Sequence, residues 1–168
     1  IEIGSLNGKN NQINFDYTSK STIGYIRSGT IHADYSGMTI EKAGDLDIQS
    51  DYSSISVNQM NNLNYDSDYG SLEIGAAQNV NGEGDYISTK LGVLHGNIFI
   101  EADYGSVKIE EMAANAGNLT IISDYTGVKI GYNEGYSFQF EIETKYAGVN
   151  GKDSFEMLVS KEKSSERY

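Results

Sequence analysis

Apolar and polar residues alternate along most of this chain, and the alternation recurs in blocks of about 17 residues. The stretch LDIQSDYSSISV shows one block, in which Leu46 and Ile48 precede Tyr52 while Ile55 and Val57 follow it. Alternation with a period of two is typical of a β-strand with one buried face, whereas a helix would repeat its apolar residues at every third or fourth position. Each block therefore predicts two short β-strands, one on either side of a corner at the tyrosine.

Asp-Tyr pairs mark these corners at near-constant spacings of 18, 17, 17, 17, 18, 21 and 21 residues, the last interval ending at a degenerate copy. The pairs are Asp16-Tyr17, Asp34-Tyr35, Asp51-Tyr52, Asp68-Tyr69, Asp85-Tyr86, Asp103-Tyr104 and Asp124-Tyr125, and the degenerate copy is Lys145-Tyr146. A small residue stands two positions before every one of these tyrosines except Tyr17. We predict that these Asp and Tyr residues form a structural ladder at one corner of a repeating coil.

One block cannot bury its own apolar face, so its neighbours must bury it. Meandering hairpins favour Asn-Gly or Asp-Gly turns, which this corner lacks, whereas a period near 20 residues favours coils stacked in register. The sequence predicts an all-β, single-stranded parallel β-helix, or solenoid, of about eight rungs with a repeat of 17–21 residues. An antiparallel sheet is the alternative. We expect one domain over residues 1–160 and a charged tail, residues 161–168, that frays or leads into further residues.

The two longer blocks and the two ends of the chain depart from the regular repeat, and their structure is predicted separately. We expect the two 21-residue blocks to bulge at residues 111–116 and 131–136 on the same side, with a loop or a single helical turn in the first. The open ends of a solenoid expose unpaired strand edges. Residues 1–6 and 155–160 are the candidates for the terminal rungs that cap them.

By strand parity, Tyr52 shares a face with Ile48 and Ser50, which predicts that the tyrosines point inward or lie across the corner. Rings stacked from coil to coil would contribute about 0.5–1.5 kcal/mol per pair beyond area burial. The alternative is an exposed aromatic strip that stacks on sugars.

The aspartates face outward, where stacked carboxylates repel by roughly 0.9 kcal/mol per neighbouring pair in water. We expect each one to accept a bond from the backbone N–H two residues on, which fixes the corner. The alternative is a column of bound Ca²⁺, although the glycine-rich nonapeptide of Ca²⁺-binding solenoids is absent. We expect the hydrogen bonds to outweigh repulsion and so to lower the aspartate pKa values.

The composition of the chain limits the kinds of partner that it is expected to bind. A formal net charge of −12 without a basic stripe argues against binding to nucleic acid or to an anionic membrane. The chain has no cysteine, hence no disulfide, and no apolar stretch long enough to predict a transmembrane segment. It opens within a strand-like run, which is compatible with a mature segment whose export signal has been removed.

No catalytic constellation stands out. The two histidines, His32 and His95, occupy non-equivalent positions and are expected on the surface. The nearest carboxylate pairs, Asp45 with Asp47 and Asp66 with Asp68, are ordinary spacings on a strand. We therefore predict no catalytic, cofactor-binding or metal-binding residues, and a protein that is not an enzyme.

The repeated unit, a small residue followed by Asp-Tyr-[Ser/Gly]-[Ser/Gly] and alternating apolar residues, resembles the adhesin β-solenoid families, domains of unknown function common in Bacteroidetes. The resemblance covers residues 11–150. It implies a right-handed parallel β-helix, export to the periplasm or cell surface, and a non-enzymatic scaffold or cell-adhesion role with a protein or glycan partner. The alternative is a pectinase-like carbohydrate-active enzyme or a glycan-binding module, because β-helices also carry such functions.

Overall fold

The computed structural model describes residues 1–137. They coincide with the first of two units into which the chain divides, Ile1–Ser137 and Phe138–Tyr168. The predicted degenerate corner at Lys145-Tyr146, the terminal rung at 155–160, the tail at 161–168 and the end of the predicted domain all lie outside the described residues.

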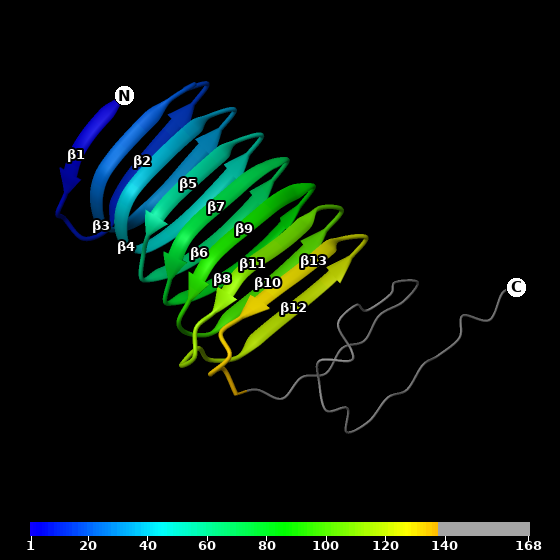
Figure 1. The fold of residues 1–168 in the computed structure, drawn as a ribbon. Helices are drawn as coiled ribbons and strands as arrows, with labels where there is room; N and C mark the ends of the chain where they lie inside the picture. Colours follow the sequence, from blue (N-terminus) through cyan, green and yellow to red (C-terminus); the bar gives the residue numbers. More distant parts are fainter. Residues whose placement is uncertain (138–168) are drawn as a thin grey trace, which may run out of the picture. The chain divides into compact units, whose positions relative to one another are not determined.

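The described residues form thirteen strands and no helix, wound into stacked coils (Figure 1). In each coil one strand segment leads to the tyrosine corner and a second leads away from it. The coils thus build two walls, which we call the first and the second sheet, although the long strands β3 and β4 run through both and join them into one 13-stranded sheet. The first sheet contains β2 (Asn11–Asp16), the second halves of β3 (Ser21–Asp34) and β4 (Gly37–Asp51), β6 (Asn62–Asp68), β8 (Asn79–Asp85), β10 (Ile98–Asp103) and β12 (Leu119–Asp124). The second sheet contains β1 (Glu2–Leu6), the first halves of β3 and β4, β5 (Ser54–Gln59), β7 (Gly70–Ala77), β9 (Ile87–Leu94), β11 (Ser106–Met112) and β13 (Gly127–Tyr132).

Every strand pairing among the described residues is parallel and joins equivalent positions of successive coils. Asp34 pairs with Asp51 and Asp51 with Asp68, for example, while Ile55 pairs with Leu72. The predicted parallel β-solenoid is therefore confirmed, and the antiparallel alternative is wrong. Strand β1 pairs only with β3 within the described part, which makes it the end strand predicted for residues 1–6.

Like side chains stack in columns between the two sheets. One column, four residues before each corner tyrosine, runs through Ile13, Ile31, Ile48, Tyr65, Gly82, Ile100 and Ile121. The isoleucines in its middle are fully buried, and Tyr65 is only 4% exposed. The large ring of Tyr65 thus lies beside the one position in the column that has no side chain.

The two longer blocks place their extra residues one above the other. The turn after β11 follows a bond from Ala113 N to Leu94 O (2.9 Å), and the turn after β13 follows one from Asn133 N to Met112 O (2.9 Å). A Cβ on Gly135 would lie 3.1 Å from that of Ala114, so the turns are neighbours. The bulges therefore lie on the same side, as predicted.

Candidate functional site: the tyrosine corner and the acidic face

Each strand of the first sheet ends at the corner aspartate because the tyrosine that follows turns the backbone. All seven tyrosines of the described corners have φ between 49° and 56°, in the left-handed region. Six of them still donate their N–H to the aspartate carbonyl of the next coil, at 2.9–3.1 Å. The ladder of hydrogen bonds therefore continues through the corner, but the alternation of side chains ends there.

The seven rings form an exposed tyrosine stack that runs from coil to coil. They are Tyr17, Tyr35, Tyr52, Tyr69, Tyr86, Tyr104 and Tyr125, with successive ring centroids 4.8–5.1 Å apart and planes within 7° of parallel. The predicted stacking of rings from coil to coil is confirmed. Of the two orientations predicted, inward or across the corner, the inward one is wrong, because the left-handed backbone turns each side chain out of the parity of its strand.

The tyrosine stack presents ring edges and hydroxyls rather than ring faces. The five inner tyrosines are 45–51% exposed because each has a parallel ring against both faces, whereas the end rings of Tyr17 and Tyr125 are 76% and 83% exposed. Sugars stack on the faces of aromatic rings. The exposed strip exists, but along most of its length the faces that sugar stacking needs are occupied by neighbouring tyrosines.

Hydroxyl side chains, rather than carboxylates, fasten the inside of the corner. Ser53 Oγ donates to the carbonyl oxygens of Ala33 (2.7 Å) and Asp51 (2.9 Å) and accepts from the N–H of Ser36 (2.9 Å). Thr126 Oγ1, four coils further along the chain, makes the equivalent bonds to the carbonyl oxygens of Ala102 and Asp124. A small residue follows six of the seven described tyrosines, with Ile87 after Tyr86 as the exception, and the sequence pattern alone does not reveal this role.

Two of the seven described corner aspartates accept a hydrogen bond from a backbone N–H of the next coil, rather than from the N–H two residues on. Asp68 Oδ1 accepts from the N–H of Asp85 (2.8 Å), and Asp103 Oδ1 accepts from that of Asp124 (2.9 Å). These bonds tie neighbouring coils together, and each of the two carboxylates keeps its second oxygen for another partner.

The prediction that hydrogen bonding lowers the aspartate pKa values is wrong at Asp51. Desolvation of its carboxylate raises the pKa of Asp51, repulsion from Asp34, Asp68 and Asp66 raises it further, and the backbone bond from Asp68 opposes these effects only in part. Repulsion between stacked carboxylates therefore opposes the ionisation of Asp51 in the folded chain.

The outward side of the first sheet, which we call the acidic face, carries most of the acidic side chains of residues 1–137. Its strands contain twelve carboxylates and neither lysine nor arginine: Asp16, Asp34, Asp45, Asp47, Asp51, Asp66, Asp68, Glu83, Asp85, Glu101, Asp103 and Asp124. The single histidine of these strands, His32, is exposed among them. Apart from this histidine, these strand segments carry no basic side chain.

Toward β12 the acidic face is hollowed into a shallow trough of about 430 Å³. Two columns of carboxylates line it, one of Asp68, Asp85, Asp103 and Asp124 and one of Asp66, Glu83 and Glu101. Gly84, Ala102 and Ser123 stand between the columns along the strands, and Ile122 takes the place of a fourth acid in the second column. Gly84 and Ala102 are buried on the core side of their strands, so the acids themselves form the walls of the hollow.

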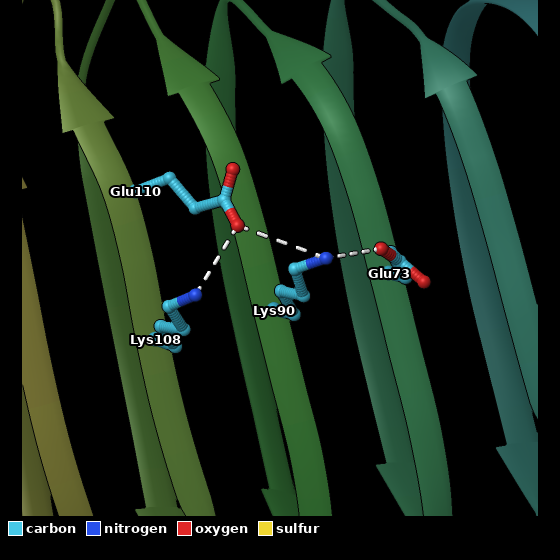
Figure 2. A network of polar contacts seen from close by, with 4 residues as sticks. All are labelled: Glu73, Lys90, Lys108 and Glu110. Carbon is cyan, nitrogen blue, oxygen red and sulfur yellow. Dashed lines mark hydrogen bonds and ion pairs between the residues drawn. The ribbon is translucent and has the colours of Figure 1, made fainter.

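The second sheet differs because its charges pair with one another (Figure 2). Lys90 Nζ on β9 lies 2.6 Å from Glu73 on β7 and 3.7 Å from Glu110 on β11, and Lys108 Nζ lies 3.2 Å from the same Glu110 oxygen. The hydrogen bond and charge of Glu73 raise the pKa of Lys90, and Lys108 lowers the pKa of Glu110. Glutamates thus offset the stacked lysines Lys90 and Lys108 on this sheet, whereas the acidic face carries stacked carboxylates without a lysine or arginine.

Sequence reasoning missed an asparagine ladder at the other corner of the coil. Asn62 Nδ2 donates to Asp45 (2.6 Å), Asn79 Nδ2 to Asn62 (2.7 Å), and Asn79 Oδ1 accepts from the N–H of Asn97 (2.8 Å). The signal was present, since these residues stand seven positions before successive corner tyrosines. Amide ladders of this kind stabilise the stack without adding charge.

The structure places the other predicted candidates apart from one another. His95 is half-buried in the turn after β9, while Asp45 and Asp47 are exposed on the acidic face away from the trough. Asp66 and Asp68 both line the trough. Within residues 1–137, no three carboxylates or imidazoles converge on a point where they could share a metal ion.

No model of a known protein family, curated protein or solved structure matches the chain. Over the described residues, no helix has both the length and the apolar character needed to cross a membrane.

Proposed function

We propose that this protein is a non-enzymatic, exported scaffold that acts in adhesion at the bacterial surface or in the periplasm, with the tyrosine stack and the acidic face as its contact surface. The observation that carries the proposal is the exposure of seven aromatic rings on seven left-handed residues. Left-handed backbone costs a residue other than glycine or asparagine about 1–2 kcal/mol. Ring stacking returns about 0.5–1.5 kcal/mol per pair.

These two quantities nearly cancel, so stability alone gives tyrosine no advantage over glycine or asparagine at the corner. A contact role supplies the missing reason, because exposed tyrosines combine apolar surface with a hydroxyl and are enriched where proteins bind partners. The stack also offers the same group in every coil, so an extended protein or glycan could make many weak contacts that add up. Export is supported by the resemblance of the repeat to the adhesin solenoid families.

The proposal is tested by coating beads with the full chain and measuring attachment to neutral polysaccharides, acidic polysaccharides and protein-coated surfaces. The variant Tyr52→Asn/Tyr69→Asn/Tyr86→Asn removes three rings but keeps residues that tolerate left-handed backbone. The matched variant with phenylalanine at the same positions keeps the rings. We expect the asparagine variant to attach roughly tenfold less and the phenylalanine variant to attach normally, because the rings supply the contact area.

Circular dichroism and thermal melts establish that both variants are folded. Attachment that is unchanged in the asparagine variant, or no attachment of the unmodified chain to any surface, would refute the proposal. Release of reducing ends from a polysaccharide, abolished by Asp66→Asn or Asp68→Asn, would instead favour the carbohydrate-active enzyme, since these carboxylates line the trough.

A further inference from the structure

We infer that the tyrosine stack is a site of oxidative modification, at which a one-electron oxidant joins the rings of neighbouring coils as dityrosine. The inference uses the geometry of the rings and the chemistry of phenols, and it does not depend on the proposed adhesive role. It assigns the stack a covalent chemistry in addition to any contact that the stack makes.

Tyrosine is the side chain on which oxidation of this chain is expected to fall. The sequence contains no cysteine and no tryptophan, which compete with tyrosine as sites of one-electron oxidation. The methionines of residues 1–137, Met38, Met60 and Met112, are at most 4% exposed, and oxidation of such side chains follows their exposure. The rings of the tyrosine stack are 45–83% exposed, so an oxidant in solution reaches them without any opening of the fold.

The arrangement of the stack exposes the atoms at which phenols couple. Removal of one electron and the hydroxyl proton from tyrosine leaves an unpaired electron shared by Oη and the two ortho carbons, Cε1 and Cε2. Parallel rings lie against both faces of each inner tyrosine, so the exposed part is the ring edge that carries these atoms. Water at this edge accepts the proton that oxidation releases.

Two such radicals on adjacent rings combine to give dityrosine. A carbon–carbon bond forms between one ortho carbon of each ring, and the hydrogen on each of these carbons then moves to the phenoxyl oxygen, which restores both hydroxyls. The two tyrosines thus lose two electrons and two protons in total. When a haem peroxidase supplies the oxidising equivalents, these electrons and protons reduce one hydrogen peroxide to two waters.

The spacing of the rings favours a partner in the next coil of the same chain. Successive centroids lie 4.8–5.1 Å apart with ring planes within 7° of parallel, so every ring already has a reaction partner beside it. Holding two reactants side by side in this way replaces a bimolecular encounter. The remaining movement brings two ortho carbons to bonding distance, and it is open to side chains whose outer edges face solvent.

Coupling between two separate chains is opposed by charge. An aspartate precedes every ring of the stack, and the chain carries a formal net charge of −12. Two stacks that approach each other therefore bring like charges together, and net charge of one sign keeps chains apart in solution. Coupling within the stack meets no such barrier, because it closes a loop within one chain, such as that from Tyr52 to Tyr69.

Two triple variants with equal numbers of tyrosines test the inference. The alternating variant, Tyr35→Phe/Tyr69→Phe/Tyr104→Phe, places a phenylalanine between any two remaining phenols of the stack. The block variant, Tyr17→Phe/Tyr35→Phe/Tyr52→Phe, leaves the phenols of the other four rings adjacent. Phenylalanine preserves ring stacking in both but has no hydroxyl to oxidise. Circular dichroism and thermal melts establish that both are folded.

The full-length parent and both variants are treated at low protein concentration with a haem peroxidase and hydrogen peroxide. Fluorescence measures dityrosine, and denaturing electrophoresis separates links within one chain from links between chains. We expect the parent and the block variant to form dityrosine in chains that stay monomeric, and the alternating variant to form roughly tenfold less, because its phenols are no longer side by side. The tyrosines outside the stack are the same in all three proteins and contribute a common background.

Three results would overturn the inference: equal dityrosine in the two variants, covalent dimers as the main product of the parent, or no dityrosine in the parent. Peptide mapping of the oxidised parent adds a further check, because the links should join tyrosines that stand 17, 18 or 21 residues apart. Links at other separations would contradict coupling along the stack. The bead assay uses chains that have not been oxidised, so failure of this modification site and failure of the adhesive role are told apart.

Discussion

The side chain of Tyr65 and the bare backbone of Gly82 fill one space between them, and Gly82→Ala tests that arrangement. The two residues pair in register within a column that is otherwise isoleucine in the described coils. A Cβ on Gly82 would overlap three atoms of the Tyr65 ring. The ring is 4% exposed and has no solvent to move into.

Two effects of known size oppose each other in this variant. Overfilling a packed core costs about 1–3 kcal/mol, whereas replacing glycine with alanine in unstrained extended backbone returns about 0.4–1 kcal/mol by restricting the unfolded chain. We therefore expect Gly82→Ala to lower the free energy of unfolding by about 1–2 kcal/mol, which corresponds to several degrees in Tm at this chain length.

The sign should reverse once the ring is removed. In a Tyr65→Ile background, which repeats the residue of the neighbouring coils, the added methyl enters open space and Gly82→Ala should stabilise by about 0.4–1 kcal/mol. The coupling free energy of the double-mutant cycle is then about 2 kcal/mol. Gly127→Ala is the control, because no atom lies within 4 Å of the Cβ it would add.

Urea unfolding followed by far-ultraviolet circular dichroism measures all five proteins, provided that their m-values agree. A Gly82→Ala change of equal size and sign in both backgrounds would refute the reasoning, because the ring would then not depend on the gap at Gly82.

Three further predictions follow from the buried and stacked groups. Burial raises the pKa of Tyr65 to about 12, against a small lowering by the nearby Thr89 hydroxyl. The stability that the neutral Tyr65 hydroxyl contributes is therefore complete below about pH 10 and is lost as pH rises toward 12. Unfolding curves measured across this pH range should show a fall in stability for the parent and a smaller fall for Tyr65→Phe. An equal fall in both proteins would contradict the assignment to Tyr65. Ser53→Ala removes a buried hydroxyl with three hydrogen-bond partners and should lower the free energy of unfolding by about 1–3 kcal/mol. Ser54→Ala removes an exposed hydroxyl and should lower it by less than about 0.5 kcal/mol. Equal losses of stability in urea titrations would contradict this difference. Because desolvation and neighbouring aspartates raise the folded pKa of Asp51, its ionisation opposes folding, so Asp51→Asn should raise Tm at neutral pH. The gain should shrink as pH falls through the raised folded pKa toward the unfolded value of about 4, and it should also shrink as NaCl is added. A variant that melts lower than the parent at neutral pH would show that the carboxylate stabilises the corner.

The local pattern of the chain was enough to determine the strands, their buried positions and the coil. Alternation such as Leu46, Ile48 and Ser50 reports which side chains share a face, and that property depends only on the two-residue period of extended backbone. The spacing of the Asp-Tyr pairs then predicts which residues stack, since a coil with a fixed length places equivalent positions on top of one another. The positions of the extra residues in the longer coils also followed from the spacing between successive Asp-Tyr pairs.

Only the tertiary structure decided where the tyrosines point and what the aspartates bind. Parity holds while the backbone stays extended, and a left-handed residue such as Tyr52 breaks it without leaving a mark in the apolar pattern. The partner of Asp68 is the backbone of Asp85, which becomes its neighbour only when the coils stack. The trough likewise exists because acids from four coils lie on one face. The net charge of the chain does not show where those acids lie. Sequence periodicity determines what repeats along the solenoid, while backbone dihedrals at the corners and contacts between coils determine which groups the solvent meets.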